Sequence, residues 1–310
     1  MTPAARLAAV IEIIDEMEET HLAGYGLRKG LQRRRYAGSG DRQAISAMFW
    51  QVHRAWARLF WHLQQCGCEV TARSITIAAQ MLADKQKPEE ITALFGGEGK
   101  HNAAALSEEE GELVARLAER QLDDPAMPRD VALEWPDFLL ADAVAALGEA
   151  TEAELLALQG EAATDVRINP VRLGDRRVLR EKFAGRGLKC HLNTLSPIGI
   201  RLEKRTRTED LPEWKKGLFE YQDEGSQIAA LLCDARPGMQ VVDMCAGAGG
   251  KALVMAALMQ NKGRVLALDS DAERWERGGE RMRRAGSHNI ARKQGGDRWG
   301  TKRWSGKVDR

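Results

Sequence analysis

Residues 241–251 of this 310-residue chain read Val-Val-Asp-Met-Cys-Ala-Gly-Ala-Gly-Gly-Lys. A short apolar run ends in Asp243, a glycine-rich turn follows, and an apolar stretch that suits a helix begins at Gly250. A strand, a glycine turn and a helix in this order build the nucleotide-type pocket of an α/β domain. The segment therefore predicts a cofactor site at the end of a sheet strand.

The residues on either side of this segment alternate between strand-like and helix-like patterns. Strands are predicted over 239–243, 263–269 and 288–294, and helices over 222–233, 250–259 and 271–285. Such alternation is typical of a parallel, doubly wound sheet. Residues 307–310 resemble the opening of a further strand. Because only 59 residues follow Lys251, we expect this α/β domain to be incomplete.

The first part of the chain is helical in pattern, with apolar residues at helical spacing and a capping box at Ser107 and Glu110. Helices are predicted from Thr2-Pro3 to about 17, from about 42 to 63, and over 73–83, 88–94, 107–121 and 137–147. Glycines punctuate residues 25–41, so the second predicted helix begins only near Arg42. Further on, strands are predicted over 165–169, 188–193 and 199–203, with a helix over 173–184. We expect three domains, at 1–128, 129–210 and 211–310.

Charge is distributed unevenly, although the net charge is only +1. Residues 107–165 hold 16 acidic and 3 basic residues, whereas residues 167–207 hold 12 basic and 3 acidic ones. Residues 274–310 hold 12 basic and 4 acidic residues. Clustered Lys and Arg attract phosphates, so the two basic blocks favour a polyanionic partner, with solvated helix faces as the alternative.

Cysteine usage and the amino-terminal pattern exclude several classes of protein. The five cysteines are odd in number and form no paired CxxC, so we expect neither a disulfide framework nor a metal site. Acidic residues interrupt the apolar residues near the amino terminus, and no run of 18 apolar residues occurs. We expect a cytoplasmic monomer that is not associated with membranes.

Three classes of ligand use a glycine turn of this kind. A phosphate-binding P-loop requires Gly at 245 and Ser or Thr at 252, and the chain has Cys and Ala there. A dinucleotide site requires GxGxxG/A, which Gly247, Gly249 and Ala252 satisfy, with Asp269 about 20 residues further on. S-adenosylmethionine uses the same strand, turn and helix, with a carboxylate on the ribose hydroxyls.

Charge favours the third of these ligands. A pyrophosphate over the turn would face the carboxylate of Asp243 and be repelled, whereas the ammonium and sulfonium of S-adenosylmethionine would be attracted. The dinucleotide, and a turn that serves packing alone, remain alternatives.

Two motifs carry a family resemblance. Tyr221-Gln222-Asp223-Glu224-Gly225-Ser226-Gln227 followed by Asp243-Met244-Cys245-Ala246-Gly247-Ala248-Gly249-Gly250-Lys251 resembles the Sun/Fmu (RsmB-like) family of RNA cytosine carbon-5 methyltransferases. The resemblance extends to 195–202 and 166–170, and the amino-terminal helices are similar to the family's NusB-like RNA-binding bundle. It implies an α/β fold class: a NusB-like bundle, a small α/β RNA-binding module and an incomplete class I (Rossmann-like) methyltransferase domain.

The resemblance also implies roles for individual residues. Cys245, Ala246, Gly247, Ala248, Gly249, Gly250 and Lys251 would wrap the methionine and ribose of S-adenosylmethionine. Asp269 would bind the ribose hydroxyls, and Asp297 would lie beside the adenine. The doubled glycine before Asp297 departs from the family pattern. The implied partner is RNA, ribosomal RNA in particular.

In this family a cysteine thiolate attacks carbon 6 of cytosine and activates carbon 5 toward the methyl group. The resemblance places that thiolate in Pro-Cys and Thr-Cys motifs downstream of the turn, and neither dipeptide occurs in this sequence. Cys245 belongs to the donor turn and is not expected to be the nucleophile. We therefore predict no catalytic residue and no activity for the chain as it stands. An RNA-binding protein without catalysis and, in last place, a nicotinamide dehydrogenase are the alternative hypotheses.

Overall fold

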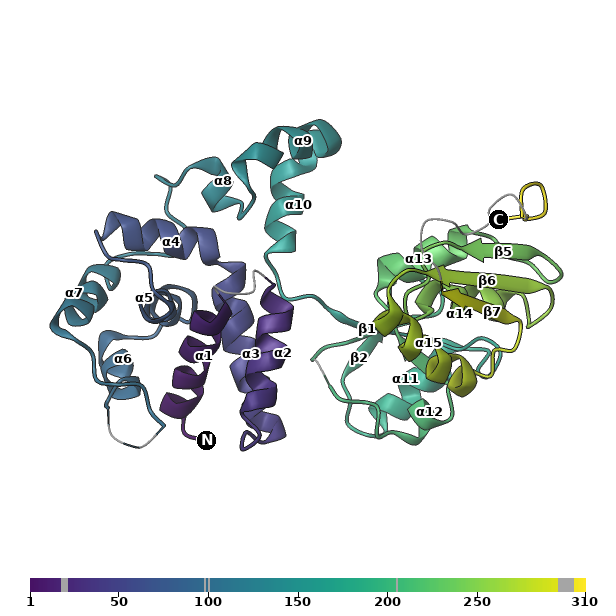
Figure 1. Ribbon diagram of the computed structural model, residues 1–310, viewed down its shortest axis with the longest axis horizontal. Coiled ribbons are helices and arrows are strands. Elements are labelled where there is room, and N and C mark those ends of the chain that lie inside the picture. Colours follow the sequence, from purple (N-terminus) through teal and green to yellow (C-terminus); the bar gives the residue numbers. More distant parts are fainter. Residues whose placement is uncertain (18–21, 98, 100, 205, 295–303) are drawn as a thin grey trace. The chain divides into compact units, whose positions relative to one another are not determined.

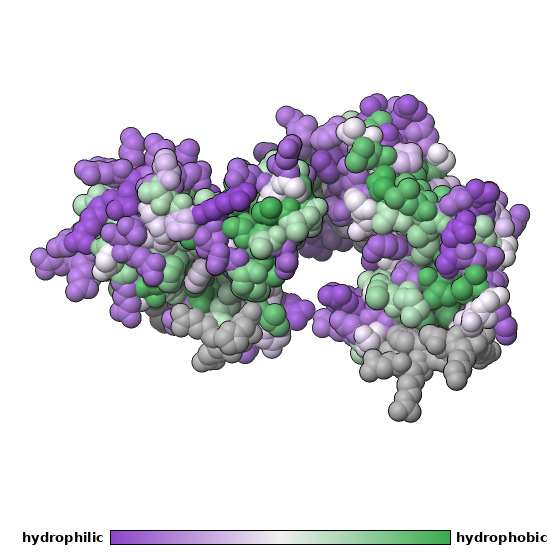
Figure 2. Space-filling view, turned by 90° about the horizontal axis from the view of Figure 1, so that it is seen from above, coloured by the Kyte–Doolittle hydropathy of each residue, from purple (hydrophilic) through white to green (hydrophobic). Residues whose placement is uncertain are grey.

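The computed structural model describes residues 1–17, 22–97, 99, 101–204, 206–294 and 304–310. The chain divides into two compact units, Met1–Glu161 and Ala162–Arg310. Figure 1 shows that the first unit is built of helices and that both sheets belong to the second. On the face seen in Figure 2, hydrophilic residues predominate and apolar residues form smaller groups between them.

The helices of the first unit enclose two apolar cores, a large one with Phe49 and Phe95 and a small one of Leu133, Ala143 and Leu155. They are α1 Pro3–Met17, α2 Ala23–Arg33, α3 Ser39–Arg54, α4 Trp56–Gln65, α5 Ala72–Ala78, the π-helix η1 Ala79–Ala83, α6 Pro88–Leu94, α7 Glu108–Leu117, α8 Arg129–Ala132, α9 Asp137–Leu147, the 3-10 helix η2 Gly148–Ala150 and α10 Thr151–Leu158. The capping box at Ser107 and Glu110 is present. The helical character of residues 1–128 is thus as predicted, while likeness to a NusB-like bundle stays a prediction.

Helix α2 occupies part of the glycine-punctuated stretch in which no helix was predicted. A Cβ on Gly26 would lie 2.3 Å from Cγ of Met17, and one on Gly30 would lie 2.5 Å from Cγ1 of Ile13. The two glycines lie one turn apart and allow α2 to approach α1 closely. A helical glycine costs about 1 kcal/mol relative to alanine, which this packing offsets. Sequence spacing alone does not reveal such a contact.

The single long helix predicted over 42–63 is wrong, because the chain breaks at Ala55 (φ −115°, ψ 20°) between α3 and α4. The carboxylate of Glu134 accepts hydrogen bonds from the main-chain N–H groups of Ala57 (2.9 Å) and Arg58 (3.0 Å). These are donors of the first turn of α4, which have no partner within the helix. A residue more than 75 positions away in the sequence thus stabilises the new helix start.

The second unit contains two sheets and five helices among its described residues. Its elements are β1 Thr164–Ile168, α11 Arg176–Ala184, β2 Cys190–Leu192, β3 Gly199–Leu202, α12 Pro212–Lys215, β4 Phe219–Tyr221, α13 Glu224–Leu232, β5 Gln240–Asp243, α14 Gly250–Leu258, β6 Arg264–Asp269, α15 Ala272–Ala285 and β7 Ile290–Gln294. The first sheet is antiparallel with the order β2-β3-β1-β4. The second is parallel with the order β5-β6-β7.

The parallel sheet agrees with the prediction, and the final residues extend it on the other side of β5. The N–H of Asp309 donates to the carbonyl of Gln240 (2.8 Å), and the N–H of Val242 donates to the carbonyl of Arg310 (3.0 Å). Strand β5 therefore has β6 on one side and these residues on the other. Ligands of open α/β sheets bind where the strand order reverses, at the carboxyl ends of the strands. The end of β5 is such a place.

Helix α14 joins the cores of the two sheets. Its Val254 belongs to the apolar cluster of the antiparallel sheet, whereas Ala252, Met255 and Ala256 pack on β5 and β6. The helix that follows the glycine turn is consequently fixed from both sides. Its first residues are therefore held in a rigid setting.

Candidate functional site

The glycine turn lies between the carboxyl end of β5 and the first turn of α14. The N–H of Ala246 donates to the carbonyl of Leu268 (2.9 Å), which ties the turn to β6. Gly247 (φ 52°) and Gly249 (φ 82°) are both in the left-handed region. This conformation costs a non-glycine L-residue about 1–2 kcal/mol, so glycine is favoured at both positions.

Asp269, at the end of β6, faces this turn as predicted. Its Oδ2 accepts from the N–H of Gly247 (2.5 Å) and its Oδ1 from the N–H of Asp271 (2.8 Å). The N–H groups of Asp271 and Gly247 hold the pKa of Asp269 below its usual value. The carboxylate therefore stays ionised near neutral pH and has lone pairs left for hydroxyl donors.

Asp243, at the end of β5, has a different environment. Burial raises the pKa of its carboxyl, against the N–H groups of Cys245 and Ala252 and the charge of Lys251, while the nearby charge of Asp269 raises it further. Among the described residues, its Oδ2 is buried and accepts no hydrogen bond. Two carboxylates that repel each other, one with a free buried oxygen, favour a cation in the space between them.

Helix α15 packs directly on the turn through a glycine. A Cβ on Gly278 would lie 3.4 Å from the carbonyl of Ala248, and one on Gly279 would lie 2.6 Å from Nη1 of Arg292. The Arg292 guanidinium instead stacks on the ring of Trp275 at 4.1 Å. Trp275 and the two glycines are unusual choices for a helix, and the structure gives each of them a packing role.

A buried ionic cluster lies beneath the turn. Glu220 of β4, whose side chain is 1% exposed, accepts from Arg281 (3.0 Å) and from Arg284 (2.5 Å). Arg284 also stacks on Trp214 at 3.8 Å. Arg281 reaches further, and its Nη1 donates to the carbonyl of Ala248 at 3.3 Å. The antiparallel sheet is thereby connected to the backbone of the glycine turn.

A second buried guanidinium, that of Arg167 on β1, approaches the turn from the same sheet. It donates to Oε1 of Gln222 (2.5 Å) and to the carbonyl of Gly250 (3.4 Å). Burial lowers the pKa of Arg167 to about 10, although the charge of Glu220 opposes this. Arg167 stays protonated at neutral pH.

The motif at residues 221–227 serves the same junction. Asp223 caps α13 through the N–H of Ser226 (3.2 Å), and Oε1 of Glu224 accepts from the N–H groups of Leu195 (2.7 Å) and Ser196 (2.8 Å). These residues position elements and do not line the turn. The sequence pattern did not reveal that Asp223 and Glu224 bind these main-chain groups. The partners of Glu224 are more than 25 residues away, and the partner of Asp223 is a main-chain group.

The sequence-predicted residues of the turn are therefore together in space with Asp269. Cys245 and Lys251 are exposed, Ala246 and Gly249 are buried, and Gly247, Ala248 and Gly250 are half-buried. Asp297 lies outside the described residues. Sequence reasoning missed Glu220, Arg281 and Arg167, since nothing in their spacing relates them to residue 248.

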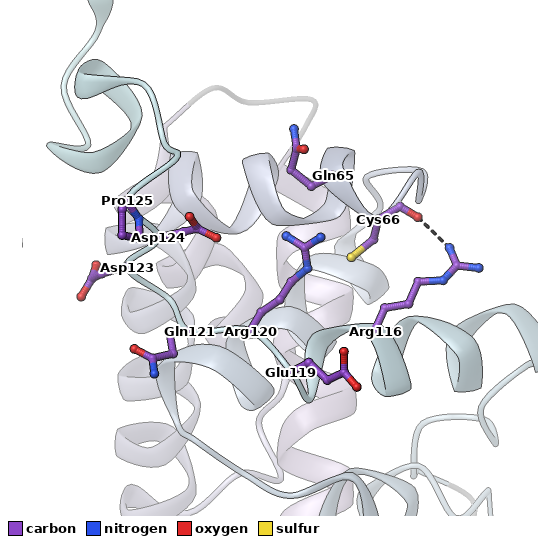
Figure 3. A pocket seen from close by; sticks show the side chains of 9 residues that line it. All are labelled: Gln65, Cys66, Arg116, Glu119, Arg120, Gln121, Asp123, Asp124 and Pro125. Carbon is purple, nitrogen blue, oxygen red and sulfur yellow. Dashed lines mark hydrogen bonds between the residues drawn. The ribbon is translucent and has the colours of Figure 1, made fainter.

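A hollow with a volume of about 760 Å³ lies elsewhere, in the first unit (Figure 3). Its lining residues are Gln65, Cys66, Arg116, Glu119, Arg120, Gln121, Asp123, Asp124 and Pro125. Arg116 donates to the carbonyl of Cys66 (2.8 Å) and pairs with Glu112, while Asp123 pairs with Arg58. Because its charges are of both signs and several are already paired, this hollow offers no defined chemistry, and the turn is the stronger site.

Membrane-spanning helices and metal-binding clusters are both absent from the described residues. None of their helices has both the length and the apolar character needed to cross a membrane. Within the same residues, no group of three or more His, Cys, Asp or Glu side chains is arranged to hold a metal ion.

Comparison with known proteins places the carboxy-terminal part of the chain. Residues 230–310 match the family model described as 16S rRNA methyltransferase RsmB/F. The 28S rRNA (cytosine-C(5))-methyltransferase of Mus musculus is 33% identical over 96 residues, which cover 31% of this chain and 21% of that protein. Ribosomal RNA small subunit methyltransferase B of Xylella fastidiosa (strain 9a5c) is 32% identical over 166 residues, 53% of this chain and 38% of that protein.

The fold is also similar to a solved structure. The crystal structure of PH0851 superposes with a TM-score of 0.67 at 20% sequence identity, covering 94% of this chain and 69% of that one. The match shows a common fold. The chain spans less than half the length of the two curated relatives above.

Proposed function

We propose, from the membership of residues 230–310 in the Sun/Fmu (RsmB-like) family of RNA cytosine carbon-5 methyltransferases, that this chain binds S-adenosylmethionine at the glycine turn and RNA on its basic segments. In the whole protein these two activities would serve methylation of cytosine in RNA, ribosomal RNA in particular. The observation that carries the proposal is the pair of carboxylates, Asp243 and Asp269, at the ends of neighbouring strands beside the turn.

The residues at the turn fit a cationic methyl donor. S-adenosylmethionine, when bound, supplies a methyl group on a positively charged sulfur. The buried, unpartnered Oδ2 of Asp243 is suited to a positive charge, and the fixed carboxylate of Asp269 is suited to hydroxyl groups. A dinucleotide would bring its pyrophosphate to the same turn, against the carboxylate of Asp243. Charge therefore supports the methyl donor over the dinucleotide.

The RNA part of the proposal is supported by basic and aromatic side chains. In the first unit, Tyr25 and Tyr36 are 45% and 61% exposed, and the cations of Arg28 and Lys29 lie 5.6 Å and 5.9 Å from the Tyr25 ring. Exposed aromatic rings beside cations are typical of surfaces that stack single-stranded bases. We propose that residues 1–128 and the basic block at 167–207 both contact RNA, within the three domains expected from the sequence.

We further propose that these 310 residues bind both ligands without transferring the methyl group. The family reaction requires a thiolate that attacks the base, and none of the five cysteines follows Pro or Thr. Cys245 is exposed on the donor turn itself, directly after Met244. A cysteine there is placed to line the donor site. The test is transfer of a labelled methyl group to RNA, and incorporation above that of a Cys245→Ala variant would contradict this proposal.

Calorimetric titration separates the ligands. The purified chain should bind S-adenosylmethionine and should not bind NAD measurably under the same conditions. RNA affinity should fall steeply with salt, since each phosphate contact to a single strand contributes about 0.7 to the slope of log K against log salt. Binding of NAD alone would favour a dehydrogenase. RNA binding without any binding of the donor would favour a non-catalytic RNA-binding protein.

The proposed contact of exposed tyrosine rings with RNA bases can be tested against a matched control variant. Tyr25→Ala should weaken binding of a short single-stranded RNA about 5- to 150-fold, the effect of losing one stacked base. Phe138 is 80% exposed on α9, within the acidic part of the chain. Phe138→Ala should leave RNA affinity unchanged, and equal losses in the two variants would refute a specific surface.

A further inference from the structure

The peptide unit that joins Ala248 to Gly249 is held at both of its polar ends. Its N–H, that of Gly249, donates to the carbonyl of Ala246 at 2.7 Å. Its carbonyl, that of Ala248, accepts from Nη1 of Arg281 at 3.3 Å. The first bond is local to the turn, whereas the second comes from another helix.

This peptide unit needs an external restraint for a conformational reason. Gly249 has φ 82°, and glycine populates positive and negative φ about equally. Rotation of the peptide plane changes ψ of Ala248 and φ of Gly249 together. A rotation of this kind converts a type I turn into a type II turn. A glycine on each side of Ala248 therefore leaves the plane with little intrinsic preference. The hydrogen bond from Arg281 selects one orientation.

Arg281 is in turn oriented by a buried partner. Its Nε donates to Oε2 of Glu220 at 3.0 Å, and its side chain is 23% exposed. Glu220 is 1% exposed, and its other oxygen accepts from Arg284 at 2.5 Å. Glu220 thus holds two guanidinium groups, of which only Arg281 has a hydrogen bond to the turn among the described contacts.

We propose that Arg281, oriented by Glu220, is a positioning residue that fixes the peptide plane between Ala248 and Gly249 for binding of the methyl donor. The inference rests on the proposed function of the turn as the donor site. It assigns to β4 of the antiparallel sheet and to α15 a part in donor binding, although neither element contributes a predicted donor ligand.

The experiment compares Arg281→Gln with Arg284→Gln. Both variants remove one of the two charges paired with Glu220, so both should lower the melting temperature of the second unit, Arg284→Gln by more because it also loses the stacking on Trp214. Only Arg281→Gln removes the bond to Ala248. It should weaken binding of S-adenosylmethionine about 10- to 150-fold, as expected for a hydrogen bond with a charged donor, while Arg284→Gln should bind with nearly wild-type affinity.

Hydrogen exchange provides a readout that does not depend on the donor. The amide of Gly249 should exchange faster in Arg281→Gln than in Arg284→Gln, because its peptide unit is then held at one end only. Arg281→Lys, which can donate a single bond in either direction, should give an intermediate affinity and serves if Arg281→Gln does not fold.

The outcomes separate this inference from the function on which it rests. Equal losses of donor affinity in the two glutamine variants, or equal exchange at Gly249, would overturn the positioning role. If the wild-type chain bound no S-adenosylmethionine, the proposed function would fail, while selective exchange at Gly249 in Arg281→Gln would still support the restraint of the turn.

Discussion

Replacement of Gly249 by alanine tests how tightly the turn is packed. The new Cβ would lie 2.7 Å from Cε of Met282, and it would occupy a backbone with φ 82°. The left-handed conformation costs about 1–2 kcal/mol for alanine, and the lower entropy of the unfolded chain offsets about 0.4–1 kcal/mol of that. Displacing the end of the Met282 side chain adds about 1 kcal/mol, the low end of the overpacking range, because Cε is the free end of a flexible chain.

The expected loss for Gly249→Ala is therefore about 1–3 kcal/mol in the free energy of unfolding of the second unit. For a unit of this size, that corresponds to a fall of about 2–12 °C in melting temperature. Differential scanning calorimetry resolves the two units better than a single optical probe, because a chain of two units need not unfold in one step.

A matched control separates backbone strain from crowding. Gly238 has φ 93°, but nothing lies within 4 Å of its Cβ position. Gly238→Ala should therefore show the backbone cost alone, below about 1.5 kcal/mol, and should leave donor affinity unchanged. Gly249→Ala should also weaken donor binding at least tenfold.

A double variant measures the crowding directly. In Gly249→Ala/Met282→Ala the clash is removed, so the two substitutions should be less harmful together than the sum of their separate effects, by about 1 kcal/mol. Additive effects, or equal losses in Gly238→Ala and Gly249→Ala, would refute the close packing of Met282 on the turn.

Three further predictions concern charge and helix packing. Burial raises the pKa of Asp243, so its ionised form opposes folding above that pKa. Asp243→Asn should therefore raise the melting temperature at pH 7 and lower donor affinity about tenfold or more. A fall in both the melting temperature and the affinity would contradict this assignment. Burial acts to raise the pKa of Asp165, but Arg201 at 2.8 Å outweighs the effect of burial, and the pKa is lowered. The ionised carboxylate therefore stabilises the fold above pH 3.8, and this stability is lost as the pH falls further. Arg201→Gln should therefore cost about 1–3 kcal/mol at pH 7, discounted for the exposure of the arginine, and flatten the acid limb of a urea-unfolding series, whereas an unchanged limb would exclude the pair as its cause. Gly26→Ala should destabilise the first unit by up to about 2 kcal/mol, because overpacking against Met17 of about 1–3 kcal/mol exceeds the roughly 1 kcal/mol gained in helix propensity. Donor binding should stay intact, and a wild-type calorimetric trace would show that α2 is not closely packed on α1.

Much of the second unit could be predicted because its signals are local. The alternation of strands and helices from residue 222 onward gave boundaries within about two residues of those observed, and the parallel sheet followed from it. The spacing placed Asp269 at the end of the strand after the turn, where it does lie, and its bond to the N–H of Gly247 was not foreseen. Its role toward the ribose stays a prediction. The two glycines at 247 and 249 were likewise identifiable, since few residues other than glycine take positive φ.

Errors arose where a distant residue decides the local structure. The break between α3 and α4 depends on the carboxylate of Glu134, and the helix over the glycines at 26 and 30 depends on the surface of α1. In both places the sequence pattern was identified correctly as apolar or glycine-rich. The observed structure differs from the prediction because a residue on another element contacts this segment.

By itself the sequence determined that a strand ends in a carboxylate before a glycine turn, and this is where we propose that a cationic cofactor is held. Only the tertiary structure decided how that turn keeps its shape. Arg281 and Glu220 are 61 residues apart and lie on different elements, yet together they reach the carbonyl of Ala248. The physical reason is that backbone preference and hydrophobic period are properties of neighbouring residues, whereas a buried ion pair exists only once folding brings its members together.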